Sequence, residues 1–293
     1  MNFFTIKDLE NLSGIKAHTI RMWEQRYDFL KPQRTESNIR YYDAHELKKM
    51  LNIALLNKFG YRVSHIAKMS EAERKEKLLN LTMPRACEER FVTELVSAMT
   101  EIDLPRFEEV LDNYILSKGL HRAVQQVIFP FLEKISMLWV TGHVDPVQEH
   151  LASGIIREKL IVAIESAYSR LEKNLTFLLF LPEGEFHELG LLYVYYLLKS
   201  KGIRVFYLGA NIAVEEAASL LSRKKIDYVF VHLTSVTNNF NPDRFLEDLT
   251  HYFDGLPVIL SGAMIRQLNP DHLSPKLICK QPFSEAIAYL NTL

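Results

Sequence analysis

From residue 174 onwards, short apolar runs alternate with longer segments of helical periodicity, and this alternation constrains the fold more than any other feature of the chain. Alternating strands and helices predict a parallel sheet with helices on both faces. We expect strands at 176–182, 204–210, 226–234, 257–261 and 276–280, and helices at 188–201, 213–224, 242–253 and 284–292. In such a doubly wound α/β fold, the flavodoxin-like strand order 2-1-3-4-5 would place a binding crevice between the first and third strands.

A histidine follows the first of these strands. The apolar run 176–181 leads into Glu185-Phe186-His187-Glu188-Leu189-Gly190, at the expected carboxyl end of the strand. Ligands bind at this edge of open α/β sheets. An imidazole there can ligate a metal through one ring nitrogen while a carboxylate holds the other. His187 is therefore a candidate metal ligand with Glu185 behind it, and a solvated or packed loop histidine is the alternative.

The composition excludes several classes of protein. A chain of 293 residues suggests two or three domains, and 48% hydrophobic residues provide sizeable cores. No apolar run reaches the roughly 18 residues that a membrane span needs. The first residues lack the basic-then-apolar form of a secretion signal, and Cys87 and Cys279 have no metal-ligand spacing. We therefore expect a cytoplasmic protein with free thiols and no membrane partner.

Charge is distributed unevenly along the chain. Residues 1–69 hold 12 Lys and Arg against 7 Asp and Glu, a net charge of +5, whereas the remainder carries −6. A basic head on an acidic body indicates that one end meets an anionic partner.

The basic head has the pattern of a helix-turn-helix followed by a wing. Thr5 and Asp8 form a capping-box pattern, and a short helix is expected after them. A turn at 13–15 precedes a second helix over 16–27, an arrangement that places the second helix in the major groove of DNA. The turn-rich segment 30–42 ends in an alternating strand, which predicts a β-wing.

Four stretches of the head carry a resemblance to the MerR-type winged helix-turn-helix. They are Thr5-Ile6, Thr19-Ile20-Arg21-Met22-Trp23-Glu24-Gln25-Arg26-Tyr27, Leu30-Lys31-Pro32-Gln33-Arg34 and Ile39-Arg40-Tyr41-Tyr42. The resemblance implies a dimeric protein that reads a pseudo-palindromic promoter site. The candidate DNA-binding residues are His18, Thr19, Arg21 and Arg26 on the second helix, and Arg34, Arg40 and Tyr41 in the wing. Each arginine alone has a solvated surface role as its alternative, and the constellation is what indicates DNA binding.

Residues 69–173 show helical periodicity only, with four helices expected near 84–101, 104–117, 119–141 and 145–171. A bundle of this size buries an ordinary core. It contains Trp139 and, ten and eleven residues later, Glu149 and His150. Taken alone, the tryptophan suggests core packing and the acid–histidine pair an exposed helix face.

The tryptophan, the acid–histidine pair and the histidine motif after the first strand together resemble the cobalamin-binding region of the CarH/LitR light-responsive repressors, which are themselves MerR-type proteins. The resemblance implies that the bundle caps the upper face of a corrin, with Trp139 over the axial adenosyl group and Glu149 and His150 in contact with it. It also implies that His187 is the lower axial ligand of the cobalt, with Glu185 behind it. Adenosylcobalamin is the cofactor expected on this basis, and light-sensitive repression the function.

The chain departs from that pattern at three places. Cobalamin modules of this group carry a Ser-x-Leu-type motif downstream of the first glycine, and this chain has His232-Leu233-Thr234 there, with Ser235-Val236-Thr237 as a shifted alternative. Where those modules have a later pair of glycines, this chain has Gly262-Ala263. Where the photoreceptors have a histidine directly after the tryptophan, this chain has Val140. The remaining cofactor-binding candidates are Gly190, His232, Thr234, Ser235, Gly262 and Ala263. His232 would either stack on the buried nucleotide tail of the cofactor or block its entry.

Three domains are expected: a winged helix-turn-helix over 1–75, a four-helix bundle over 76–173 and a Rossmann-like cobalamin-binding domain over 174–293. The expected partners are double-stranded promoter DNA and further copies of the chain, as a dimer or tetramer, with a protein antagonist as an additional candidate. A DNA-binding protein whose decayed pocket docks a protein partner is the alternative. A corrinoid methyl carrier is disfavoured by the basic head. We find no Walker loop, Cys-x-x-Cys or nucleophile–base set, so we expect no catalysis.

Overall fold

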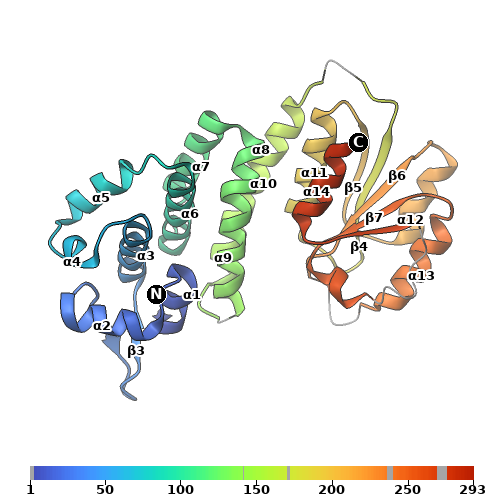
Figure 1. The fold of residues 1–293 in the computed structure, drawn as a ribbon. Coiled ribbons are helices and arrows are strands. Elements are labelled where there is room, and N and C mark those ends of the chain that lie inside the picture. The colour runs from blue at the N-terminus through green and yellow to red at the C-terminus, as the bar shows by residue number, and fades with distance from the viewer. Residues whose placement is uncertain (1–2, 141, 170–171, 236–239, 269–275) are drawn as a thin grey trace. The chain divides into compact units, whose positions relative to one another are not determined.

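The computed structural model describes residues 3–140, 142–169, 172–235, 240–268 and 276–293. The chain forms two compact units, Met1–Ile156 and Arg157–Leu293 (Figure 1). No helix among the described residues is long and apolar enough to cross a membrane.

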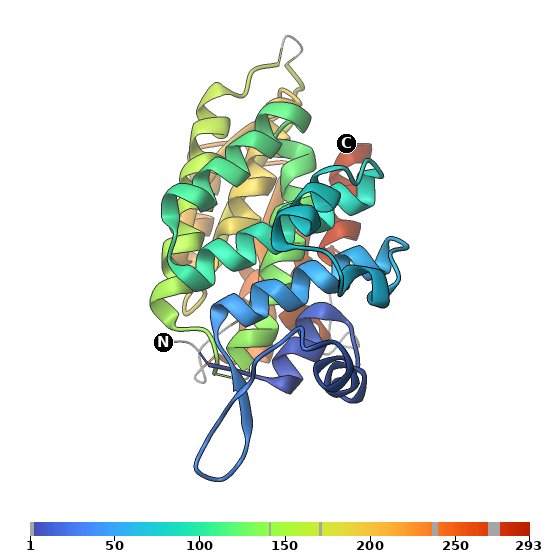
Figure 2. The same ribbon diagram turned by 90° about the vertical axis from the view of Figure 1, so that its left-hand side faces the viewer.

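The first unit begins with the predicted winged helix-turn-helix. Its elements are β1 (Phe4–Thr5), α1 (Ile6–Ser13), α2 (Ala17–Tyr27), β2 (Gln33–Arg34), β3 (Arg40–Tyr42), α3 (Ala44–Lys58), α4 (Val63–Ile66) and α5 (Glu71–Leu79). The capping box at Thr5 and Asp8 is formed, and Asp43 caps α3 as its position before the helix suggests. The three strands make an antiparallel sheet of order β1-β3-β2. The β2–β3 hairpin, blue in Figure 2, extends away from the helices of the head.

Five helical elements follow over the segments that the periodicity predicts, except that the last helix ends at Ser166, short of the predicted 171. They are α6 (Pro84–Glu101), α7 (Leu104–Lys118), α8 (Leu120–Ala123), α9 (Phe129–Val140) and α10 (Pro146–Ser166). Between α8 and α9 the helix passes through a π-helical turn, η1 (Val124–Ile128), which the sequence pattern does not reveal. Buried side chains such as Phe107 and Phe131, whose ring centroids are 5.4 Å apart, fill the core between these helices.

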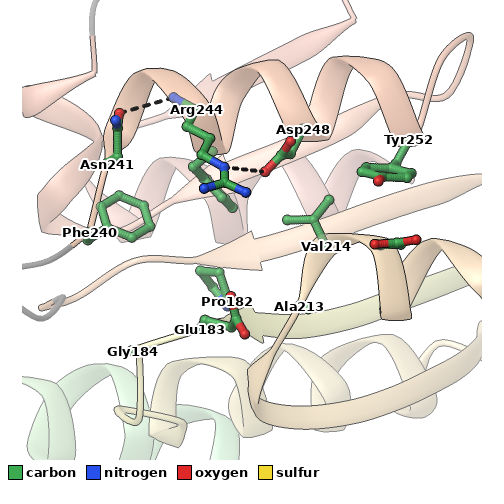
Figure 3. A pocket seen from close by; sticks show the side chains of 12 residues that line it. Pro182, Glu183, Gly184, Ala213, Val214, Phe240, Asn241, Arg244, Asp248 and Tyr252 are labelled. Carbon is green, nitrogen blue, oxygen red and sulfur yellow. Dashed lines mark hydrogen bonds and ion pairs between the residues drawn. The ribbon is translucent and has the colours of Figure 1, made fainter.

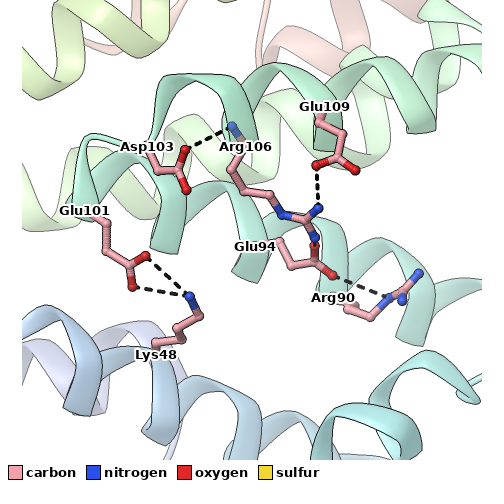
Figure 4. Close-up of polar contacts among 7 residues, drawn as sticks. All are labelled: Lys48, Arg90, Glu94, Glu101, Asp103, Arg106 and Glu109. Carbon is pink, nitrogen blue, oxygen red and sulfur yellow. Dashed lines mark hydrogen bonds and ion pairs between the residues drawn. The ribbon is translucent and has the colours of Figure 1, made fainter.

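Polar contacts fix the head against the helical region. Lys48 on α3 pairs with Glu101 on α6 at 3.3 Å, beside a cavity of about 380 Å³ that is lined by charged side chains of both regions (Figure 4). Lys134 on α9 donates to the carbonyl of Leu12, at the C-terminal end of α1. The head and the helical region are therefore one compact unit.

The second unit is the predicted doubly wound sheet. Its elements are β4 (Thr176–Pro182), α11 (Leu189–Ser200), β5 (Arg204–Ile212), α12 (Val214–Ala218), η2 (Ser219–Ser222), β6 (Tyr228–His232), α13 (Pro242–Tyr252), β7 (Val258–Ser261), η3 (Ala263–Gln267), β8 (Leu277–Lys280) and α14 (Phe283–Thr292). The strand order β5-β4-β6-β7-β8, with parallel pairing throughout, confirms the flavodoxin-like order. Helices α11 and α14 cover one face, and α12 and α13 cover the other (Figure 1).

The sheet positions the histidine motif through its central strand. All seven residues of β4 are buried, as expected for an unbroken apolar run between two helical layers. The neighbouring strand β6 ends at His232, two residues earlier than its apolar pattern predicts. It ends there because the amides of Thr234 and Ser235 bind the side chain of Glu185 instead of extending the ladder.

Candidate functional site

The carboxylate of Glu185 joins two loops at the carboxyl edge of the sheet. It is fully buried. Its Oε1 accepts hydrogen bonds from the amides of Phe186 and His187, both at 2.9 Å, and lies 2.7 Å from His187 Nδ1. Its Oε2 accepts from the amides of Thr234 and Ser235, at 2.6 and 2.8 Å. The structure thus brings together four of the predicted site residues, at the carboxyl ends of the first and third strands.

These hydrogen bonds keep Glu185 ionised. Burial is the largest single influence and by itself would raise the pKa of the carboxyl. The hydrogen bond with the His187 ring and those from the amides of His187, Ser235 and Thr234 outweigh it, so the pKa lies below its usual value. An ionised carboxylate only accepts hydrogen bonds, so His187 Nδ1 is the donor, and the carboxylate fixes the orientation of the ring.

His187 has the setting that a metal-ligating histidine requires. Its side chain is 58% exposed, and Nδ1 is the nitrogen that Glu185 holds, so a metal would bind at Nε2. Among the described residues, no three His, Cys, Asp or Glu side chains gather as a metal cage. A single oriented imidazole therefore fits a metal that brings its other ligands with it, as the cobalt of a corrin does.

Two supports of this loop are not evident from the sequence. Asn211, at the end of β5, accepts from the amide of Gly184 (3.0 Å) and donates its own amide to the carbonyl of Glu185 (3.2 Å). Glu188 accepts from Arg157 and from Tyr207, whose hydroxyl is 2.6 Å from Glu188 Oε2. Burial, together with the hydrogen bond and the charge of Glu188, raises the pKa of Tyr207. Only the three-dimensional fold brings these residues to the loop.

The remaining candidates of this unit lie behind His187. His232 ends β6 and points toward Gly190 on α11, where a Cβ atom would lie 2.7 Å from His232 Nε2. Gly262 has a φ of +114°, and a Cβ there would lie 2.1 Å from the carbonyl oxygen of Leu233, so only glycine fits. Ala263 is exposed at the start of η3, and its methyl group is accommodated at the surface. Val236 and Thr237, from the shifted alternative motif, lie outside the described residues.

A separate cavity of about 510 Å³ opens on the opposite face of the sheet, between α12 and α13 (Figure 3). Glu183, Phe240 and Arg244 line it, and Arg244 pairs with Asp248 at 3.8 Å. It shares the carboxyl edge of β4 with the histidine loop, but the predicted site residues do not line it.

The first unit holds the three candidates for the upper face of the corrin. Trp139 on α9 is 48% exposed, so it is not the packed core residue that a tryptophan taken alone suggests. Glu149 and His150 lie on α10, where His150 Nδ1 is 3.1 Å from Glu149 Oε2 and the His150 side chain is 76% exposed. Val140 ends α9.

The predicted DNA-binding residues differ in how they are presented. On α2, His18, Arg21 and Arg26 are exposed and Thr19 is half-buried, and in the wing Arg34 is exposed. The Tyr41 hydroxyl donates to Gln33 across the hairpin, at 2.8 Å. Arg40 is partly buried, and its Nε lies 3.3 Å from Glu24 Oε2 on α2, while the Tyr42 hydroxyl donates to the other oxygen of Glu24. Arg40 therefore braces the wing against the recognition helix.

Comparison with known proteins agrees with this arrangement. Residues 4–73 match the MerR HTH family regulatory proteins, and residues 92–163, in the helical region, match the B12 binding domain. The chain thus carries a MerR-type helix-turn-helix, which implies DNA binding, and a B12-binding domain.

Its relatives include two repressors of Myxococcus xanthus. The chain is 29% identical over 275 residues to the HTH-type transcriptional repressor CarH, with 90% of each chain covered. It is 28% identical over 268 residues to the repressor CarA, with 89% of this chain and 87% of CarA covered. These similarities confirm the predicted resemblance and the prediction of a regulator rather than an enzyme.

A solved structure shares the fold of most of this chain. The monomethylamine corrinoid protein of Methanosarcina barkeri aligns with a TM-score of 0.56 at 13% identity, over 70% of this chain and 100% of the other. At this identity the likeness concerns the fold, and it confirms the predicted helical region followed by a Rossmann-like sheet.

Proposed function

We propose that this regulator is a repressor whose hold on promoter DNA is controlled by adenosylcobalamin, with His187 as the lower ligand of the cobalt and light as the signal. The observation that carries the proposal is the buried, ionised Glu185 beneath an exposed His187, in a chain that also has a MerR-type head. When bound, the cofactor supplies a cobalt centre with a light-sensitive axial alkyl group. The protein supplies the oriented imidazole of His187 and, on α9, the exposed Trp139 that would respond to a change in the cofactor.

The response would pass through α9. This helix carries the exposed Trp139, and the same helix holds α1 of the head through Lys134. The turn that follows it brings His143 Nδ1 within 3.1 Å of Asp8 Oδ2, in the capping box of α1. A ligand that binds one arrangement of Trp139 better than another shifts the population of that arrangement. Both contacts would transmit the shift to the DNA-reading helices.

DNA binding in the two cofactor states tests this proposal. Fluorescence anisotropy with the chain's own promoter region would be measured without cofactor, with adenosylcobalamin in darkness, and after green light. We expect tighter binding in darkness, in an oligomer detected by light scattering, and release after illumination. Equal affinities for DNA before and after illumination would contradict the proposal that light is the signal. If adenosylcobalamin nevertheless tightens DNA binding to the same extent in darkness and in light, the signal is the supply of the cofactor.

A pair of variants assigns the effect to the site. His187→Ala removes the proposed ligand, whereas His251→Ala removes an exposed histidine on α13, in the same unit. We expect His187→Ala alone to abolish the change in DNA binding and to alter the visible spectrum of the bound cofactor. If no variant and no parent protein retains cofactor, the alternative of a pocket that docks a protein partner is supported.

A further inference from the structure

The ring of His232 is wedged between the sheet and the two helices α11 and α14. The residue is 7% exposed, and its ring centroid lies 4.5 Å from that of Phe283 on α14. On the other side it approaches Gly190 of α11 so closely that a methyl group there would clash with Nε2 and Cδ2, at 2.7 and 2.8 Å. The ring therefore fills the space directly behind the His187 loop, between β6 and α11.

Two polar atoms at this place have no hydrogen-bond partner among the described residues. In the parts of the chain that the structure describes, His232 Nδ1 and Ser261 Oγ are buried without a hydrogen-bond partner. His232 and Ser261 are register partners on β6 and β7, so their side chains point to the same face of the sheet. A buried polar atom left without a hydrogen-bond partner destabilises the folded protein. Such a pair in one place indicates a polar subsite rather than an optimised core.

The imidazole is neutral in this position. Burial lowers the pKa of His232 to about 4, with a smaller opposing influence from the charge of Glu185. At neutral pH the ring thus packs as an uncharged aromatic group against Phe283. An uncharged ring can remain there without a counter-ion, which makes His232 a stable occupant of the space.

We propose that His232 closes the slot between β6 and helices α11 and α14, so that the protein accepts corrinoids whose lower nucleotide base stays outside the fold. This inference rests on the proposed corrinoid site at His187. Ser261 would be the polar floor of the slot, which a small residue at position 232 would expose. His232 thereby acts as a specificity-determining residue: it makes a corrinoid without a nucleotide tail at least as good a ligand as one with a tail.

Titrations of the full-length protein in darkness, followed by visible absorbance, test the assignment. Adenosylcobinamide, which has no lower nucleotide, and adenosylcobalamin differ in the tail and share the upper group. We expect the parent protein to bind adenosylcobinamide at least as tightly as adenosylcobalamin. His232→Ser should tighten adenosylcobalamin binding by about tenfold or more while adenosylcobinamide changes by less than about threefold. His232→Phe, which keeps a ring in the slot, should behave as the parent does.

The outcomes separate this inference from the proposed function. A parent protein that binds adenosylcobalamin much more tightly than adenosylcobinamide overturns the inference and leaves the proposed function intact, and so does a His232→Ser protein with unchanged preference. Unchanged adenosylcobinamide binding shows that the variant is folded. Should neither corrinoid bind the parent or His232→Ser, both proposals fall. Should His232→Ser alone bind adenosylcobalamin, the closed slot is supported and cofactor control of the parent is not.

Discussion

Lys134 Nζ donates a 2.7 Å hydrogen bond to the carbonyl oxygen of Leu12, which ties helix α9 to the C-terminal end of α1. The last carbonyls of a helix have no partner within it, so the lysine satisfies a group that would otherwise need solvent. Burial lowers the pKa of Lys134, with smaller influences from Glu89, which raises it, and Lys58. This side chain thus joins the helix that carries Trp139 to the first helix of the DNA-reading motif.

Lys134→Met should loosen this connection. The methionine keeps most of the apolar stem but leaves the Leu12 carbonyl unpaired, which costs about 1–3 kcal/mol. We expect a lower midpoint of urea unfolding for the first unit, as measured by tryptophan fluorescence. We also expect weaker DNA binding. Lys118→Met, at an exposed position on α7, is the matched control and should change neither. Equal effects of the two variants would show that the contact is not what supports the head.

Glu185→Gln should release the loops that the carboxylate joins. The amide group would face a backbone N–H, and charge-assisted hydrogen bonds worth about 1.5–3 kcal/mol each would be lost or weakened. Hydrogen exchange followed by mass spectrometry should show faster exchange in peptides that contain residues 186–187 and 234–235, with unchanged exchange in α6. Full protection of these peptides in the variant would mean that backbone packing alone holds the loop.

The buried His232 should make folding stability depend on pH. Its pKa is about 4 in the folded protein, against 6.5 for an ordinary histidine. Between these values the unfolded chain binds a proton that the folded chain does not, so stability is complete above pH 6.5 and falls as the pH drops. From pH 7 to pH 5 this histidine should account for a loss of about 2 kcal/mol.

His232→Phe should lack that part of the pH dependence. Urea unfolding followed by circular dichroism would be compared at pH 7 and pH 5 for the parent and the variant. Other titrating groups, Glu185 among them, contribute to both proteins and cancel in the difference. Parallel losses in the two proteins would place the imidazole in solvent rather than between α11 and α14.

Arg34 and Arg40 should affect DNA binding in different ways. Arg34 is exposed in the wing, so Arg34→Ala should reduce the slope of log affinity against log salt by about 1, as expected for one lost phosphate contact. Arg40 braces the wing through Glu24, so Arg40→Ala should also lower the thermal stability of the head. Anisotropy titrations at several salt concentrations, with melting curves, would separate the two. Matching slopes for the parent and Arg34→Ala would rule out the phosphate contact.

The elements of this fold could be predicted because their signals are local. The unbroken apolar run of β4, the alternation that follows it and the capping box at Thr5 each depend on neighbouring residues. The pairing of Glu185 with His187 is also local, since only Phe186 lies between them and one turn brings them together. Sequence spacing alone was therefore enough to find the histidine and its carboxylate.

The rest of the site depends on contacts that sequence does not encode locally. Asn211 and Tyr207 reach the histidine loop from β5, which is distant in sequence. In the sequence, Arg40 looks like one more wing arginine, and only the structure shows that it contacts Glu24. The sequence left two roles open for His232, stacking on a nucleotide tail or blocking it. Only its closeness to Gly190 and Phe283 favours the second role.

The π-helical turn η1 takes up one residue more than a regular helical turn. Its hydrogen bonds run between residues five apart instead of four, so the additional residue is accommodated within the turn and the helix after it keeps its direction. A one-residue deletion in η1 that restores a regular helix should therefore leave Lys134 and Trp139 facing the same neighbours. A deletion in the regular helix α9 between these two residues would instead rotate Trp139 by about 100° relative to Lys134, so the length of α9 is more constrained than the length of η1.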